Sequence, residues 1–193
     1  MTAGPRARYR EQVRDEVRAH AWEQIVEAGA SALSLKAIAK KMGMTAPALY
    51  RYFASRDELL TELVLTAYQD LAEVVEAVPV DAAPETTLRL LAEALRDWAS
   101  TNPQRYLLVY GTPVPGYSAP PDATDLARRI FTPLVTAYTD LLGSPEAAFG
   151  RSVTFWSRLH GVLSLELAGH FAGMGVDTGA LYDAEIRSVT GKA

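Results

Sequence analysis

Residues 34–56 read SLKAIAKKMGMTAPALYRYFASR, a pattern that predicts two short helices joined by a tight turn. The first helix is expected over residues 35–42, because its apolar side chains recur every three or four positions on one face. Ser34 can cap the N-terminus of this helix, and Gly43 follows its end, where a left-handed backbone favours glycine. Two helices joined by a short glycine turn are the layout of a helix-turn-helix.

The second helix is expected over residues 46–53. Thr45 can cap it, and Pro47 is tolerated in its first turn because the N–H at that position has no intrahelical partner. At about 1.5 Å per residue this segment would extend about 12 Å, close to the width of the major groove of DNA. The pattern therefore predicts that residues 46–53 enter the groove.

Hydrophobic periodicity predicts α-helix along nearly all of the remaining chain, and no strand pattern or internal repeat competes with it. The fold class is therefore expected to be all-α, with a helix-turn-helix head over residues 1–56 and a helical body over 79–193. A helix over 55–78, opened by the capping box of Ser55 and Glu58, would link the two. Further helices are expected over 8–27, 85–101, 103–110, 122–142, 146–171 and 177–189.

Prolines and glycines mark the breaks between the predicted helices of the body. Residues 79–84 are expected to form a short linker, and residues 111–121, GTPVPGYSAPP, a loop. Pro133 falls inside the helix expected over 122–142 and should kink or divide it.

The net charge of −4 hides an uneven distribution. Residues 1–56 carry ten basic and five acidic side chains, whereas residues 57–193 carry nine basic and eighteen acidic ones. A basic head on an acidic body is typical of a protein that docks one end on phosphates. Because the basic cluster coincides with the predicted helix-turn-helix, DNA binding is favoured over a solvated basic face.

Composition disfavours several other functions. The absence of cysteine excludes disulfides, thiolate metal sites and thiol catalysis. No apolar run approaches the roughly 20 residues of a membrane span, and the N-terminus lacks a secretory signal, so a cytoplasmic protein is the default expectation. No catalytic motif accompanies the three histidines, and His160, Glu166 and His170 do not share one helix face. Neither an enzyme, a metal site nor a cofactor is therefore expected.

The patterns described so far resemble a known family. The first 60 residues are similar to the DNA-binding head of the TetR/AcrR bacterial transcriptional regulators, through EAGA at 27–30 and LSLKAIAKKMGMTAPALYRYFASRDELL at 33–60. The body resembles family members that carry a Trp-x-x-x-His-Gly element, here residues 156–161, and NPQRYLLVYGTPVPGY at 102–117 is similar to the same subgroup. The resemblance implies a regulator with a small-molecule effector in the body. Repression relieved by the ligand is the commoner behaviour in the family and is taken as the expectation.

The candidate DNA contacts fall into two groups. Helix N-termini, hydroxyls and basic side chains would bind phosphates and set the register, whereas a few side chains would read base edges. The resemblance implies that Tyr50 contacts a phosphate and that Arg56 anchors the DNA backbone. The candidate phosphate contacts are Ser34, Thr45, Tyr50, Tyr52 and Arg56, and the candidate base contacts are Thr45, Ala46, Ala48, Arg51 and Lys36.

Other side chains of the head have alternative interpretations. Leu49 and Phe53 are expected to pack against the first helix rather than to contact DNA. Lys40 and Lys41 are equally consistent with phosphate contacts and with solvated charges. The arginines at positions 6, 8 and 10 are interpreted as a flexible arm that contacts DNA.

One recognition helix is too small for a tight specific complex, so two heads are expected to bind one double-stranded, pseudo-palindromic operator. The helix over 146–171 is apolar on more than one side. With the helix over 177–189 it is expected to pair with its copy in a homodimer, which is also where family members dimerise. The residues assigned to this interface are Trp156, Leu159, Leu163 and Leu167.

Aromatic side chains of the body are candidates for an effector pocket, although an aromatic at helical spacing lies in a core more often than in a binding site. The candidates are Trp98, Tyr106, Tyr110, Phe131, Tyr138, Phe155 and His160. They would suit an effector with an apolar or aromatic portion. The entrance is expected to flex at Pro133 and the loop over 111–121, and tilting of the helix over 55–78 would couple the pocket to the head. The alternative function is a helical protein–protein adaptor that retains the head fold.

Overall fold

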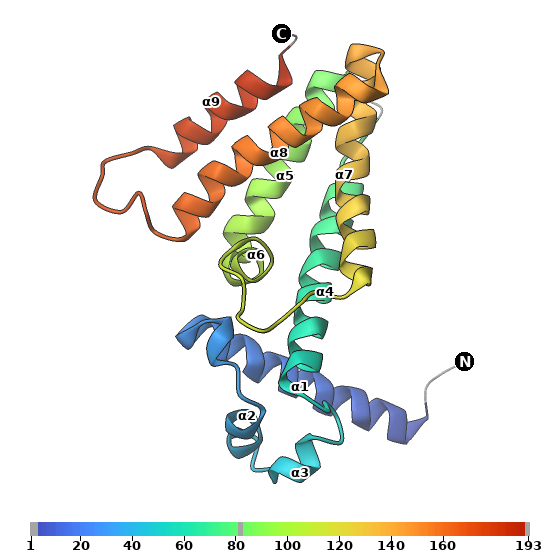
Figure 1. Ribbon diagram of the computed structural model, residues 1–193, viewed down its shortest axis with the longest axis vertical. Coiled ribbons are helices and arrows are strands. Elements are labelled where there is room, and N and C mark those ends of the chain that lie inside the picture. The colour runs from blue at the N-terminus through green and yellow to red at the C-terminus, as the bar shows by residue number, and fades with distance from the viewer. Residues whose placement is uncertain (1–3, 81–82, 192–193) are drawn as a thin grey trace. The chain divides into compact units, whose positions relative to one another are not determined.

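The computed structural model describes residues 4–80 and 83–191, and every regular element within these ranges is a helix (Figure 1). This confirms the all-α prediction. The elements are α1 (Pro5–Ala28), the 3-10 helix η1 (Ala30–Ala32), α2 (Leu35–Lys41), α3 (Ala46–Leu49), α4 (Arg56–Glu76), α5 (Pro84–Thr101), α6 (Pro103–Tyr110), α7 (Pro121–Leu142), α8 (Pro145–Leu167) and α9 (Thr178–Thr190). None of these helices is long and apolar enough to cross a membrane.

The chain forms two compact units whose bounds differ from the expected head and body. Unit 1 holds the described residues up to Leu65 together with the segment Thr112–Pro120, and unit 2 holds the described remainder. The helix α4 therefore contributes to both units. The loop after α6 belongs to unit 1, where Tyr117 Oη lies 3.2 Å from Thr61 Oγ1. The linker predicted over 79–84 lies partly outside the described residues.

Unit 1 is held together by a four-residue apolar repeat on α1 and by the first half of α4. Val13, Val17, Ala21 and Ile25 are all buried along one stripe of α1. The start of α4 is capped as predicted, because the Glu58 N–H donates to Ser55 Oγ at 3.0 Å. Figure 1 shows α2 and α3 together at one end of this unit.

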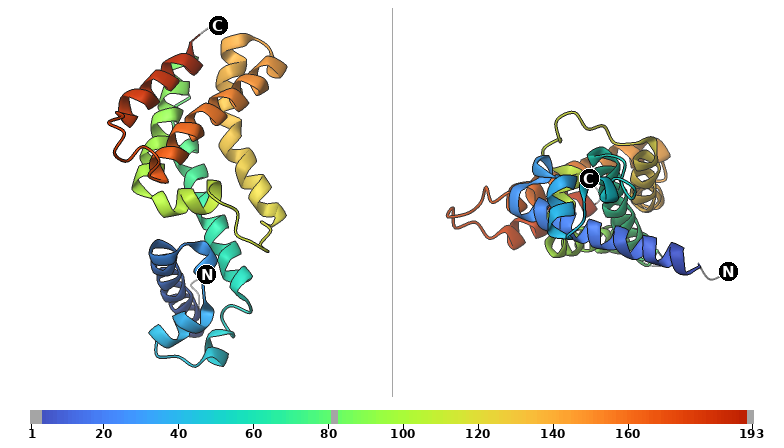
Figure 2. Two further views of the ribbon diagram at one scale, coloured as in Figure 1. Left: turned by 60° about the vertical axis from the view of Figure 1, so that its left-hand side comes forward. Right: turned by 90° about the horizontal axis from the view of Figure 1, so that it is seen from below.

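Unit 2 is a bundle in which α8 packs against both α7 and α9, and α5 packs against α7 (Figure 2). Its core contains fully buried tyrosines, whose hydroxyls need partners away from water. The Tyr182 hydroxyl donates to Ala92 O at 2.8 Å and joins α9 to α5. The Tyr138 hydroxyl donates to Val189 O at 2.5 Å and joins α7 to the end of α9. These bonds fix how the helices that surround the candidate pocket pack together.

Two predictions for the head are corrected by the structure, and so is the division of the helix expected over 122–142. The helix expected over 46–53 ends at Leu49, and the chain continues through turns in which Tyr52 N–H donates to Leu49 O at 2.8 Å. The helix α7 is not divided at Pro133, which lies inside it. The arginines at 6, 8 and 10 do not form an arm, because α1 already begins at Pro5 and carries them, exposed, in its first turns.

Candidate DNA interface and effector site

The helix-turn-helix is fixed to α1 through the N-terminus of α2. Ser34 Oγ accepts from the Ala37 N–H at 3.3 Å, as its capping position predicted, and the Ser34 N–H donates to Gln24 Oε1 at 2.9 Å. The turn that follows needs Gly43, whose φ of +66° lies in the left-handed region. The N-terminus of α2 is therefore held against α1 by the hydrogen bond between Ser34 and Gln24.

Beyond this turn, Thr45 occupies the N-cap position of α3, but its hydroxyl makes no capping bond. Pro47 lies in the first turn of α3, as predicted. The uncommitted Thr45 hydroxyl and the exposed N-terminus of α3 are thus available to a phosphate.

The outer surface of α2 and α3 carries the polar side chains expected to meet DNA. Lys36, Thr45 and Arg51 are exposed, and Tyr50 has 41% of its surface accessible. Among the described residues, the side chains of Lys36 and Arg51 make no ion pair or hydrogen bond. Ala46, Ala48 and Tyr52 are half-buried beside them. Leu49 and Phe53 are fully buried, which agrees with the prediction that they pack inside the head.

The two lysines at the end of α2 differ in their surroundings. The Lys41 ammonium lies 2.6 Å from Glu23 Oε2, and this contact raises the pKa of Lys41 and lowers that of the carboxyl group. Lys40 is exposed and makes no such contact within the described part of the chain. Lys40 is therefore the more available of the two to a phosphate.

Arg56 is placed differently from the DNA anchor that the resemblance implied. Its guanidinium donates to the backbone oxygens of Leu33 at 3.2 Å, Ala30 at 3.1 Å and Ser31 at 3.3 Å, and it also bonds Asp57 at 3.3 Å. Most of its N–H donors are thereby committed within the head. We conclude that Arg56 joins the first turn of α4 to η1 and the start of α2.

The Arg56→Ala variant is expected to lower the free energy of unfolding of the head by about 1–3 kcal/mol, because three backbone carbonyls lose a charged donor. Urea denaturation followed by circular dichroism measures this change. Arg51→Ala is the matched control, since Arg51 is exposed and its side chain makes no ion pair or hydrogen bond within the described residues, and it should change stability by less than about 0.5 kcal/mol. Equal effects of the two substitutions would contradict the bracing role of Arg56.

Four of the seven predicted pocket residues converge in one aromatic cluster in unit 2. His160 on α8 stands at its centre, with ring centroids 4.2 Å from Trp156, 4.4 Å from Tyr110 and 5.4 Å from Tyr106. Phe131 on α7 joins the cluster through Trp156 at 5.1 Å. Trp156, which had been assigned to the dimer interface, is therefore a member of this cluster.

Two further residues of this cluster were not predicted from the sequence. Tyr68 on α4 lies 6.0 Å from Tyr110, edge to face. Ser164, one turn beyond His160 on α8, has its Oγ 2.9 Å from Tyr106 Oη. Helical spacing signals Ser164, which is four positions from His160, but no sequence signal connects Tyr68 to the cluster.

The remaining predicted pocket residues lie elsewhere. Tyr138 is committed to Val189 and stacks edge to face with Phe155 at 6.3 Å, so it stabilises the bundle rather than the cluster. Trp98 is buried in the core of unit 2, and its Nε1 has no hydrogen-bond partner among the described residues. Phe155 is buried as well, but it lines a cavity described below.

The aromatic cluster is electrically neutral at ordinary pH. Burial lowers the pKa of His160 to about 3, so the imidazole is uncharged. Burial also raises the pKa of Tyr106 to about 12 and raises that of Tyr110 further. Neutral hydrogen bonding and apolar contact are therefore the interactions that the cluster offers.

An apolar cavity adjoins the cluster through Trp156. The space between its lining atoms is about 200 Å³, a volume that includes solvent outside the opening, and each of its lining side chains is apolar. Trp156 lines this cavity and also contacts His160. The lining residues come from α4, α5, α7 and α8 and are Val75, Leu91, Leu95, Ile130, Leu134, Phe155 and Trp156.

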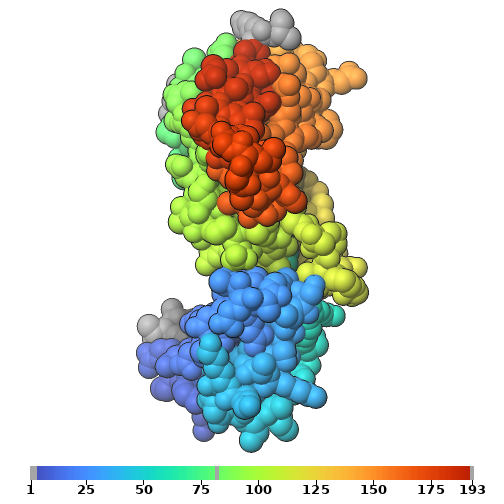
Figure 3. All heavy atoms as spheres, turned by 90° about the vertical axis from the view of Figure 1, so that its left-hand side faces the viewer, coloured from blue at the N-terminus to red at the C-terminus, as the bar shows by residue number. Residues whose placement is uncertain are grey.

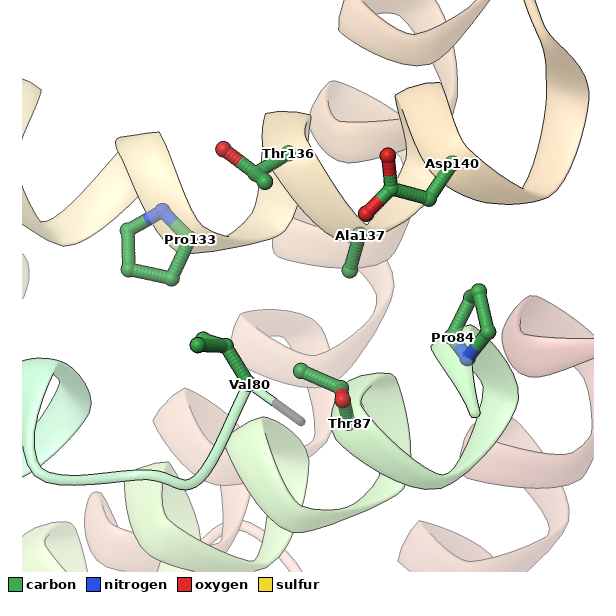
Figure 4. Close-up of a pocket in the computed structure, with 7 residues that line it drawn as sticks. All are labelled: Val80, Pro84, Thr87, Pro133, Thr136, Ala137 and Asp140. Atoms are coloured by element: carbon green, nitrogen blue, oxygen red, sulfur yellow. The ribbon is translucent and has the colours of Figure 1, made fainter. Parts of the chain in front are cut away.

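A second, more polar pocket lies between α7 and the start of α5 (Figure 4). It encloses about 240 Å³ including its opening. Thr87 contributes a buried hydroxyl that has no partner among the described residues, and Asp140 contributes a carboxylate. Pro133 lines this pocket and not the apolar cavity. Of the residues that line this pocket, only Pro133 had been predicted from the sequence to lie near an effector site.

The predicted dimer residues Leu159 and Leu163 are fully buried within the protomer, and Leu167 packs against the same core, so the assignment of these side chains to a partner surface is corrected. The exposed face of α8 instead carries Phe149 at 59%, Val153 at 41% and Leu165 at 44% accessible surface. Figure 3 shows α9 and the turn before it at the surface of unit 2 beside α8.

Two glycines lie on this same exposed face of α8. A Cβ atom added at Gly150 or Gly161 would meet no other atom within 4 Å. Packing within the protomer therefore does not require glycine at either position, although glycine weakens a helix interior by about 1 kcal/mol relative to alanine. Their presence is consistent with close approach of another chain.

Two family models match separate parts of the chain. The family model described as bacterial regulatory proteins, tetR family, matches residues 18–63, and the model described as tetracyclin repressor-like, C-terminal domain, matches residues 88–189. The chain is 37% identical to the HTH-type transcriptional regulator Rv1816 of Mycobacterium tuberculosis, over 95% of this chain and 93% of that protein. The chain therefore belongs to the TetR family of transcriptional regulators, whose members bind DNA and small molecules and are not enzymes.

Solved structures show the same fold. The crystal structure of SCO4313 has a TM-score of 0.87 and 50% sequence identity, and the match covers 96% of this chain and 98% of that one. The structure of FadR from Bacillus subtilis in complex with stearoyl-CoA has a TM-score of 0.69 at 14% identity, covering 91% and 96% of the two chains. A TetR variant from Acinetobacter baumannii in complex with minocycline has a TM-score of 0.63 at 16% identity, covering 90% and 92%. The fold alone does not select one ligand, since these two proteins bind different compounds.

Proposed function

We propose that this regulator is a repressor whose homodimer binds a pseudo-palindromic operator through α2 and α3 and is released by a small-molecule effector held in unit 2. The observation that carries the DNA-binding part is the exposed surface of α2 and α3. Lys36 and Arg51 extend from it without partners among the described residues, beside the exposed Tyr50 and Thr45. Long basic side chains with uncommitted donors are suited to phosphates and to guanine edges.

Most contacts of this surface are proposed to position the DNA rather than to read its sequence. Ser34 and Thr45 lie at helix N-termini, where backbone N–H groups and the helix dipole favour phosphate. Tyr50 and Tyr52 would add phenolic donors. Base reading then depends on Ala46, Ala48, Arg51 and Lys36, together with the shape of the DNA.

The homodimer is proposed to form through the outer face of α8 and through α9. The three exposed apolar side chains of this face flank Gly150 and Gly161, which permit close helix approach. Pairing α8 and α9 with their copies would produce a four-helix interface about a two-fold axis. A two-fold dimer presents two heads, which matches the symmetry of a pseudo-palindromic operator.

The effector is proposed to bind at the aromatic cluster and the adjoining apolar cavity of unit 2. The element Trp156, His160 and Gly161 would place the protein in the Trp-x-x-x-His-Gly subgroup, with the first two residues in the cluster and the third on the dimer face. Because α4 contributes Tyr68 to the cluster and its first half to unit 1, its tilt is a means of coupling the two sites. If the effector lowers the affinity for the operator by some factor, then bound operator lowers the affinity for the effector by the same factor.

Selection of operator sequences followed by binding measurements over a range of salt concentrations tests the DNA-binding proposal. The logarithm of the binding constant should fall steeply and linearly with the logarithm of salt concentration. Tyr50→Phe should weaken binding alike on all sequences, whereas Arg51→Ala should relax preference at one position and cost about 1–3 kcal/mol there. Arg128→Ala, an exposed change in unit 2, is the control.

A protein–protein adaptor is the competing function. An adaptor would show neither a preferred DNA sequence nor the salt-dependent binding expected of a regulator. That outcome would contradict the proposed binding to a specific operator. It would also contradict the proposed release from that operator by an effector.

A further inference from the structure

His160 has one ring nitrogen that the protein leaves unused. Tyr106 Oη lies 2.8 Å from its Nδ1 and 2.9 Å from Ser164 Oγ, so that nitrogen and both hydroxyls form a closed hydrogen-bonded set. Nε2, in contrast, has no access to solvent and no hydrogen-bond partner among the described residues. Buried polar atoms in native proteins are normally paired, so an unpaired one calls for a partner from outside the chain.

Trp156 contacts the His160 ring and also lines the apolar cavity. Its ring centroid is 4.2 Å from that of His160 and 5.1 Å from that of Phe131, and the same side chain lines the cavity. A rotation of Trp156 would therefore join the cavity to the imidazole. A molecule in the enlarged space would touch aliphatic and aromatic side chains from four helices and would meet one buried polar atom of the cluster, His160 Nε2, that has no hydrogen-bond partner among the described residues.

On this basis we propose that the effector is an uncharged, ring-sized apolar molecule with a single hydrogen-bonding group, and that this group binds His160 Nε2 when Trp156 moves aside. The inference rests on the proposed function, since it names the class of ligand for the same site. Trp156 would act as a gate, and His160 would be the residue that distinguishes a polar ligand from a hydrocarbon.

The surroundings argue against charged ligands. The cavity lining contains no basic or acidic side chain, and the rings around His160 carry no charge. Carboxylates, phosphates and ammonium groups would lose their hydration without gaining an opposite charge. A neutral hydroxyl, carbonyl or amide loses much less on entering the site and gains the bond to Nε2.

Three small probes test the proposal on the full-length protein without DNA: benzyl alcohol, toluene and benzoate. Their affinities can be measured by ligand-observed NMR at millimolar concentrations. Benzyl alcohol is expected to bind at least tenfold more tightly than benzoate, because only benzoate is charged. His160→Leu should weaken benzyl alcohol about tenfold and leave toluene unchanged, since toluene cannot bond Nε2.

Matched variants separate this role from general packing. His160→Gln retains a hydrogen-bonding group and should recover part of the affinity for benzyl alcohol, and His170→Leu, at an exposed histidine, should change neither probe. Binding of benzyl alcohol should also alter tryptophan fluorescence, and Trp156→Phe should abolish that change. If His160→Leu does not fold, the affinities of the unmodified protein for benzyl alcohol and for benzoate still test whether the site prefers a neutral ligand.

The proposal is overturned if benzoate binds as tightly as benzyl alcohol, if His160→Leu weakens both neutral probes equally, or if none of the probes binds. Operator affinity measured without any probe is independent of these results. A protein that binds its operator but rejects neutral probes would therefore lose this inference and keep the proposed DNA-binding function.

Discussion

The Val153→Glu variant is expected to be a monomer at micromolar concentration and to bind operator DNA at least about 100-fold more weakly than the unmodified protein. Val153 lies on the outer face of α8 with 41% of its surface exposed, close to Gly150 and Gly161. In the proposed dimer, a two-fold axis would bring two such glutamates together in an apolar interface, where unpaired charge is strongly disfavoured. Each head would then bind half of the operator alone and lose the avidity of the pair.

Analytical ultracentrifugation measures the oligomeric state of this variant, and fluorescence anisotropy with labelled operator measures its affinity. Val74→Glu is the matched control, because Val74 is a helical valine with 36% of its surface exposed on α4. The control should remain dimeric and keep its affinity. Should Val153→Glu sediment as a dimer, the outer face of α8 would not be the interface.

The case of α8 shows what the sequence could and could not predict. Its pattern correctly indicated a helix with more apolar side chains than one face can hold. The pattern could not tell which side would be covered by the same chain, because that depends on where α7 and α9 pack against α8. Leu159 and Leu163 therefore lie in the protomer core, and the exposed side carries Phe149, Val153 and Leu165 instead.

Local signals predicted the head more successfully. Ser34, Gly43 and Ser55 act through hydrogen bonds or dihedral angles of their own neighbourhood, so their roles could be read from short stretches. Arg56 could not be placed in this way, because its partners are backbone carbonyls 23 to 26 positions earlier in the chain. The aromatic cluster could not be predicted for the same reason, since Tyr106 and His160 are 54 positions apart in the chain.

The Phe53→Ala variant is expected to lower the free energy of unfolding of the head by about 3–5 kcal/mol and to abolish operator binding. Phe53 is fully buried directly after the turns that follow α3. The Arg14 guanidinium lies 4.1 Å from the centre of its ring and also donates to Tyr52 O and Glu62. Removing the ring would leave a cavity and would deprive Arg14 of a cation–π contact that adds about 0.5–2 kcal/mol. The DNA-facing segment would then be attached to α1 chiefly by the bond from Arg14 to Tyr52 O.

Urea denaturation followed by circular dichroism measures this loss, and the two units allow for separate transitions of head and body. Only the transition of the head should move in Phe53→Ala. Tyr50→Ala is the control, because it truncates an exposed aromatic three positions earlier and should alter stability by less than about 1 kcal/mol while still weakening DNA binding. A loss below about 1 kcal/mol in Phe53→Ala would mean that the recognition segment is held by α2 and its turn alone.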